Sequence, residues 1–163
     1  MDLDALCLKL LACRQPMASD LRFVTLTLKM VTDLERIADL AVNICERAVD
    51  LSQQPTLGTY QTIPAMGRIV ATMVRDAIQA FIAQDAHMAT QVIERDDELD
   101  DMYHTVFRHL LTLMTEDTEV VERGIHIQSI AKFLERMGDH ATNLAEQVIF
   151  HVDGTDVRHS GKL

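Results

Sequence analysis

The sequence predicts an all-α protein of two tandem antiparallel three-helix bundles, the first of which is incomplete at its N-terminus. First, the 163 residues are 48% hydrophobic with few aromatics, 6 Gly and 3 Pro, which suits helices packed through aliphatic side chains. Second, apolar residues near the end of the chain recur every three or four positions, as along the seam of a helical bundle. These seven seam residues are Ile127, Ile130, Leu134, Met137, Ala141, Leu144 and Val148. Third, residues 34–46 align without a gap on residues 134–146, and such a repeat indicates duplicated architecture.

The first half of the chain predicts two helices. Residues 2–13 are apolar with a helical pattern, and Pro16 follows them as a helix terminator. Ser19 is expected to cap the second helix, which extends to about Leu51 without an internal Gly or Pro. A three-helix unit would need one more helix than this half provides.

The second half predicts three helices. Thr62 is expected to cap the first, and Asp85 to break the chain and cap the next, which runs to about Met114. After a turn at residues 115–118, the last helix reaches about Val152. The predicted domains are therefore 1–52 for the partial first bundle, 53–62 for a linker, 63–152 for the second bundle and 153–163 for a flexible tail.

Charge and composition exclude several classes of function. The formal net charge of −10 argues against a nucleic-acid partner, because phosphates require a basic surface. No apolar run approaches the roughly 18 residues that span a bilayer, so direct membrane insertion is not expected. The acidic start of the chain does not resemble a signal peptide, which predicts a cytoplasmic protein. The three cysteines form no CxxC pair and are expected to be small buried thiols.

Pairs of acids four residues apart are the main candidates for a binding site. Spacing of four places both carboxylates on one helix face about 6 Å apart, where like charges destabilise a helix. A hard cation would remove this repulsion, because such ions take oxygen ligands. The alternative is a solvated acidic face neutralised by Arg36, Arg95 and Arg136. The pairs are Glu35 with Asp39, Asp96 with Asp100, and Glu135 with Asp139.

A catalytic function has little support in the sequence. A ferritin-like di-iron enzyme needs Glu-x-x-His motifs, and none occurs. No serine-protease order, phosphate-binding glycine loop or Cys/His zinc pattern is present. We therefore predict that the protein is not an enzyme. A carboxylate-bridged metalloenzyme or iron-binding helical bundle remains the alternative, and a purely structural bundle is a third possibility.

Several motifs resemble the PhoU family of phosphate-uptake regulators. They are Arg14-Gln15-Pro16-x-x-Ser19-Asp20-Leu21-Arg22, Leu34-Glu35-Arg36-Ile37-x-Asp39 and Glu135-Arg136-x-Gly138-Asp139. The resemblance covers nearly the whole chain and implies a fold of two similar three-helix bundles.

The resemblance also implies metal binding. Some family members hold multinuclear metal clusters, iron most notably, on two acidic pairs per bundle; zinc, manganese and magnesium are the alternatives. The second cluster motif matches Asp96, Asp100, Glu135 and Asp139, and the first matches Asp4, Glu35 and Asp39. The fourth acid of the first motif would fall just before Met1, so that site is one carboxylate short.

The function implied by the resemblance is that of a signalling adaptor. The family represses the phosphate-starvation response by linking the phosphate ABC transporter to a sensor histidine kinase. The implied partners are the ATPase subunit of that transporter and the PAS domain of that kinase. Because the first bundle leaves apolar residues uncovered, we also expect a homodimer.

Overall fold

The computed structural model describes residues 3–57 and 61–154, and these residues contain helices and no strand. The all-α prediction is therefore confirmed for this part of the chain. The predicted tail, residues 153–163, lies almost wholly outside the described residues. The helices are α1 (Leu3–Arg14), α2 (Ser19–Ser52), α3 (Thr62–Ala83), α4 (Ala86–Glu94), α5 (Asp96–Glu116), the short 3₁₀ helix η1 (Thr118–Val120) and α6 (Val121–Asp153).

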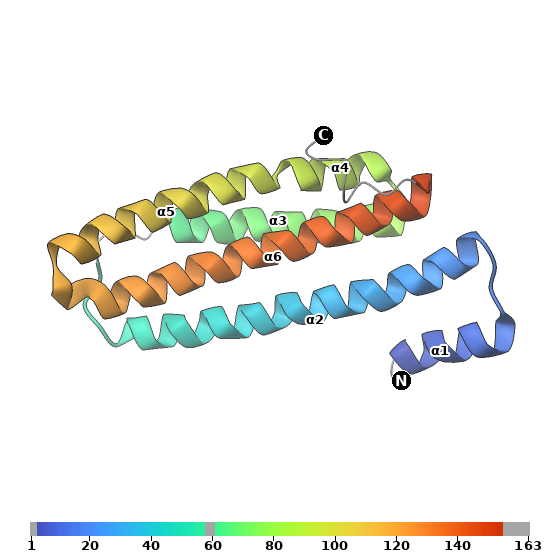
Figure 1. Cartoon of the computed structure of the whole chain (residues 1–163), viewed down its shortest axis with the longest axis horizontal. Coiled ribbons are helices and arrows are strands. Elements are labelled where there is room, and N and C mark those ends of the chain that lie inside the picture. The colour runs from blue at the N-terminus through green and yellow to red at the C-terminus, as the bar shows by residue number, and fades with distance from the viewer. Residues whose placement is uncertain (1–2, 58–60, 155–163) are drawn as a thin grey trace.

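Helix α6 is the centre of the molecule (Figure 1). It packs against α2, α3, α4 and α5, and α3 also packs against α4 and α5. The second half of the chain thus forms a three-helix bundle in which α4 and α5 together make one long arm. Helix α2 runs antiparallel to α6 along its free side, and α1 folds back beside the start of α2. Within the described part of the chain, α1 packs on α2 alone.

The arm predicted as one helix from Asp85 to Met114 is two helices, which corrects that boundary. The division falls at Arg95, whose backbone stays near the helical region (φ −76°, ψ −16°), so the arm bends without a loop. Three acids occupy the first turn after the division, Asp96, Asp97 and Glu98. A helix N-terminus stabilises negative charge, which gives a physical reason for a new helix to begin there.

The predicted caps are partly right. Asp85 caps α4 by accepting a hydrogen bond from the backbone N–H of Met88 at 3.0 Å. Ser19 is not the cap of α2, because the helix already includes it and Ala18 holds the capping position without a side-chain hydrogen bond. Thr62 is likewise the first residue of α3, after Gln61.

The core follows the apolar pattern of α6. Of the seven predicted seam residues, Met137 is partly buried and the other six are fully part of the buried core. These six are Ile127, Ile130, Leu134, Ala141, Leu144 and Val148. Cys7 is buried, but Cys13 and Cys45 are exposed, which corrects the expectation for those two thiols. No helix in the described ranges is long and apolar enough to cross a membrane.

Candidate functional site

The start of α5 and the middle of α6 bring four predicted carboxylates together. Asp96 and Asp100 lie on α5, and Glu135 and Asp139 lie on α6. Burial first, and then the charges of its neighbours, Asp100, Asp139 and Glu135 among them, together raise the pKa of Asp96 to about 7. These four residues, the acidic cluster, are therefore one electrostatic unit.

Gly138 allows α6 to approach α5 at the acidic cluster. A Cβ atom at this position would overlap the side chain of Leu99 and lie 3.1 Å from Oδ1 of Asp96. Leu99 is fully buried, so the close approach also desolvates the neighbouring Asp96. Oδ1 of Asp96 is buried and has no hydrogen-bond partner among the described residues.

Lys132 offsets part of the charge of the acidic cluster. Its Nζ donates a hydrogen bond to Oε1 of Glu135 at 2.7 Å and forms an ion pair with Oε2 at 2.6 Å. Desolvation is the largest influence on Asp100 and Asp139, and it keeps the pKa of both carboxyl groups raised although Lys132 acts to lower it. Lys132 is thus a positively charged side chain in direct contact with the acidic cluster. Arg95, one of the expected neutralising residues, instead pairs with Asp76 of α3 at 2.8 Å.

The acidic cluster is not arranged as a finished set of ligands. In residues 3–57 and 61–154, no three His, Cys, Asp or Glu side chains are placed so that they could hold one metal ion. The four carboxylates interact through their charges without converging on a point. The chemistry of the donors suits a hard cation, and the unpartnered oxygen of Asp96 could accept one.

The predicted site in the first half of the chain is exposed, in contrast to the acidic cluster. Asp4 on α1 and Glu35 and Asp39 on α2 are all exposed, and they belong to no metal-competent group in the described ranges. The reason is that α1 and α2 have no neighbour on this side comparable to the α5 that covers α6. Among the residues that the structure describes, a partly buried acidic cluster is therefore present in the second half and not in the first.

A polar link between α2 and α6 was not predicted from the sequence. Nδ1 of His140 lies 2.9 Å from Oδ1 of Asp33, and Nε2 of Gln147 donates to Oδ2 of Asp33 at 3.0 Å. Further along, Nδ1 of His126 lies 3.7 Å from Oδ2 of Asp50. These contacts fix the antiparallel register of α2 on α6.

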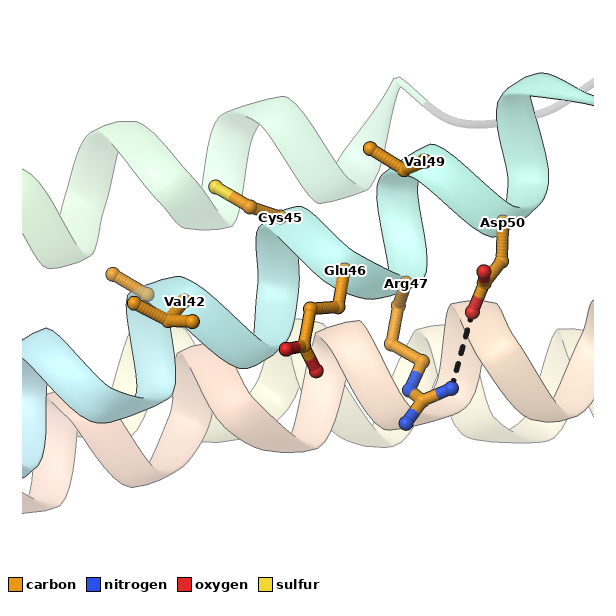
Figure 2. A pocket seen from close by; sticks show the side chains of 7 residues that line it. Val42, Cys45, Glu46, Arg47, Val49 and Asp50 are labelled. Carbon is orange, nitrogen blue, oxygen red and sulfur yellow. Dashed lines mark hydrogen bonds and ion pairs between the residues drawn. The ribbon is translucent and has the colours of Figure 1, made fainter.

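The outer face of α2 carries an exposed apolar strip, shown in Figure 2. Val42 and Val49 are each 58% exposed, and Cys45 lies between them on the same face. Arg47 and Asp50 form an ion pair of 3.1 Å beside the strip. The shallow hollow over this face is lined by Ala41, Val42, Cys45, Glu46, Arg47, Val49 and Asp50.

Comparison with known proteins gives a consistent result. The family model described as the PhoU domain matches residues 1–48 and 63–148. A phosphate-specific transport system accessory protein PhoU homolog from Pseudomonas putida is 43% identical over 161 residues, covering 98% of this chain and 63% of that protein. The homolog from Aquifex aeolicus is 42% identical, covering 97% of this chain and 72% of that protein. The chain thus spans less than two thirds of the first relative.

Solved structures agree with the sequence relatives. The crystal structure of PhoU from Pseudomonas aeruginosa superposes with a TM-score of 0.90 at 41% identity, over 93% of this chain and 73% of that one. The phosphate transport system regulatory protein PhoU from Streptococcus pneumoniae gives a TM-score of 0.86 at 27% identity, over 94% of this chain and 72% of that one.

Proposed function

This chain belongs to the PhoU family, and from that premise we propose that it is a cytoplasmic negative regulator of phosphate uptake that acts by binding. The observation that carries the proposal is the family match over both halves of the chain. It is supported by the 43% identical relative, which is named as an accessory protein of phosphate transport. That name agrees with the prediction that the protein is not an enzyme.

The proposed partners are the ATPase subunit of the phosphate ABC transporter and the PAS domain of the phosphate sensor histidine kinase. By holding both, the protein would report transporter activity to the kinase and keep transcription of the phosphate-starvation genes low. Its net charge of −10 favours basic surfaces on these partners, because complementary charge steers and orients association.

The regulatory test is a reporter assay in a bacterial strain that lacks its own PhoU protein. Expression of this chain should restore repression of a phosphate-regulated promoter when phosphate is abundant. Purified chain should also retain the ATPase subunit and the isolated PAS domain in pull-down assays. Full reporter activity despite normal expression of the folded chain would refute the proposal.

We further propose that the acidic cluster binds metal ions, iron first and zinc, manganese or magnesium as alternatives. Asp96, Asp100, Glu135 and Asp139 would be the ligands, after side-chain rotation brings their oxygens together. A bound cation would offset the mutual repulsion of these carboxylates. It would also give the unpartnered oxygen of Asp96 a partner. Asp4, Glu35 and Asp39 are the proposed ligands of a weaker first site, because all three are exposed.

Elemental analysis of protein purified without chelator tests the metal proposal. The double variant Glu135→Ala/Asp139→Ala should lose most of the bound metal. Glu119→Ala/Glu122→Ala is a matched control, since it removes two exposed acids elsewhere and should leave the metal content unchanged. Equal metal content in all three proteins would exclude the acidic cluster as the site. An oxidase assay on the iron-loaded protein checks the metalloenzyme alternative, and we expect no turnover.

We also propose a homodimer formed through the apolar strip of α2. The repeat supports this, because position 45 matches position 145 and position 49 matches position 149. Ala145 and Ile149 on α6 are buried, whereas Cys45 is exposed and Val49 is 58% exposed. The strip is therefore the face that the second half covers and the first half leaves open. A second copy of the chain offers a matching strip in a two-fold arrangement.

A further inference from the structure

A cavity lies at the end of the bundle where α2 begins and where α3 and α6 end. Its volume is about 460 Å³, within the range of roughly 300–1,000 Å³ that is usual for small-molecule sites. The acidic cluster contributes no residue to it, although part of the Arg14–Arg22 motif does. The lining residues are Ser19, Asp20, Arg22, Phe23, Gln84, His151 and Val152.

Two nitrogen atoms in the lining of this cavity have no hydrogen-bond partner among the described residues. Nε of Arg22 and Nδ1 of His151 are buried, and neither has a hydrogen-bond partner in the described part of the chain. Among those residues, no carboxylate lies within ion-pair distance of the Arg22 guanidinium, although Asp20 lines the same cavity. A buried guanidinium N–H without an acceptor is unfavourable, and an anion is the partner that best satisfies it.

Aromatic rings in contact with one another form part of the remaining wall. Phe23 stacks on Phe81 with ring centroids 5.7 Å apart and 13° between the ring planes. His151 meets the same Phe23 ring at 5.8 Å in a tilted arrangement, so its ring is held in place. Ser19 adds a hydroxyl from the first turn of α2, a helix of 34 residues whose N-terminus has no side-chain cap.

We propose that this cavity binds a phosphate group, either as inorganic phosphate or as the phosphate of a nucleotide. Arg22 would pair with the phosphate oxygens after a small rotation of its guanidinium, with hydrogen bonds added by Ser19 and His151. Arg is well suited to this role because its planar fork of donors matches phosphate geometry. The Phe23 ring would contact whatever group the phosphate carries.

Asp20 opposes anion binding and therefore gives a second, independent test. Asp20 lines the same cavity as Arg22, so its negative charge should weaken the binding of an anion there. Removing this charge should tighten phosphate binding, whereas removing the charge of Arg22 should weaken it. A fold that merely collapses on mutation cannot produce these opposite changes.

Calorimetric titration of the full chain in phosphate-free, chelator-treated buffer tests the proposal. The probes are inorganic phosphate, AMP, adenosine and sulfate. We expect saturable binding of phosphate or AMP with a Kd below about 1 mM. Tight binding of phosphate itself identifies the free ion as the ligand, and binding of AMP alone identifies a phosphomonoester. Failure of both, or equal binding of sulfate or adenosine, overturns the assignment.

Three variants complete the experiment. Arg22→Gln should weaken binding at least about tenfold, and Asp20→Asn should tighten it about threefold. Arg47→Gln is the matched control, because Arg47 lies on the same helix but pairs with Asp50 away from the cavity, and it should bind as the wild type does. Unchanged affinity in Arg22→Gln would refute the site while leaving the regulatory proposal intact.

Discussion

His140 of α6 lies against Asp33 of α2, with 2.9 Å between Nδ1 and Oδ1. Both side chains are mostly shielded from water, at 19% and 15% exposure. The second oxygen of Asp33 accepts from Gln147 at 3.0 Å, so one carboxylate contacts α6 at two positions that lie about two helical turns apart. Since α2 packs mainly on α6, with α1 beside it and the Phe23–Phe81 contact to α3 near its start, this carboxylate is a principal polar anchor of α2.

Replacing Asp33 should therefore loosen the first half of the chain. Asp33→Ala leaves His140 and Gln147 without their shared acceptor and should lower the free energy of unfolding by about 1–3 kcal/mol. Urea denaturation followed by circular dichroism measures the change. Glu46→Gln is the control, an exposed acid on the same helix whose replacement should have little effect. Equal stability of Asp33→Ala and wild type would show that the link contributes nothing.

Gly138 and Gly67, two of the helical glycines, should respond in opposite ways to the same substitution. Gly138→Ala places a methyl group against Leu99 and Asp96 and should destabilise the protein by about 1–3 kcal/mol. Gly67→Ala has no neighbour within 4 Å of the new Cβ and should stabilise α3 by about 1 kcal/mol. Thermal melts of both variants test this. A stabilising Gly138→Ala would mean that α5 and α6 adjust freely at the acidic cluster.

The acidic cluster predicts how stability depends on pH in metal-free protein. The pKa of Asp96 is 3.8 ordinarily and about 7 in the fold. The folded state therefore holds more protons between these values, and the free energy of unfolding falls as pH rises through this window. The raised pKa values of Asp100 and Asp139 act in the same direction.

Asp96→Asn isolates this effect because it removes the titrating group. In the presence of chelator, the variant should be more stable than wild type at about pH 8, and the difference should shrink toward zero near pH 4. Urea denaturation at several pH values gives both numbers. A difference that is the same at both ends of the window would contradict the raised pKa.

The apolar strip of α2 predicts the oligomeric state. Light scattering at micromolar concentration should report a dimer, and Val42→Glu should convert it to a monomer by placing a charge in the apolar contact. Ile82→Glu is the control, because Ile82 is 67% exposed on α3 outside the strip. A wild-type monomer would exclude the proposed dimer.

Thiol cross-linking gives a second readout of the same interface. In a two-fold dimer centred on the strip, Cys45 lies close to the Cys45 of the other copy. A short bifunctional reagent should therefore link the two chains in wild type and in Cys13→Ser, and should fail in Cys45→Ser. Cross-linking that depends on Cys13 instead would place the contact elsewhere.

Most of the fold could be predicted because its signals are local. The burial of Leu134, Ala141 and Leu144 follows from helical periodicity along α6, and the cap at Asp85 follows from side-chain chemistry. The division at Arg95 escaped prediction because neither Gly nor Pro marks it. The prediction that Ser19 caps α2 was wrong because the turn before α2 holds Ala18 in a positive-φ conformation. No local sequence pattern indicates this conformation.

The candidate site shows the same division between local and distant information. Asp96 and Asp100 share a helix face by spacing, and a hairpin of antiparallel helices then suffices to bring them beside Glu135. The contact of Asp33 with His140 joins residues 107 positions apart, and it depends on how far α2 slides along α6. The cavity formed by Arg22 and His151 depends on the same register, so neither was visible in the sequence.

Helix α2 is attached to the second bundle mainly through α6, and this has a consequence for the local unfolding of the molecule. The contacts of Asp33 with His140 and Gln147 close loops of more than a hundred residues, whereas α3 to α6 are joined by short connections. Such distant contacts form late and are the first to be lost when a region opens below the global unfolding energy. The α1–α2 hairpin is therefore expected to unfold locally as one cooperative unit. In a hydrogen–deuterium exchange experiment its amides should exchange together, while those of the second bundle stay protected.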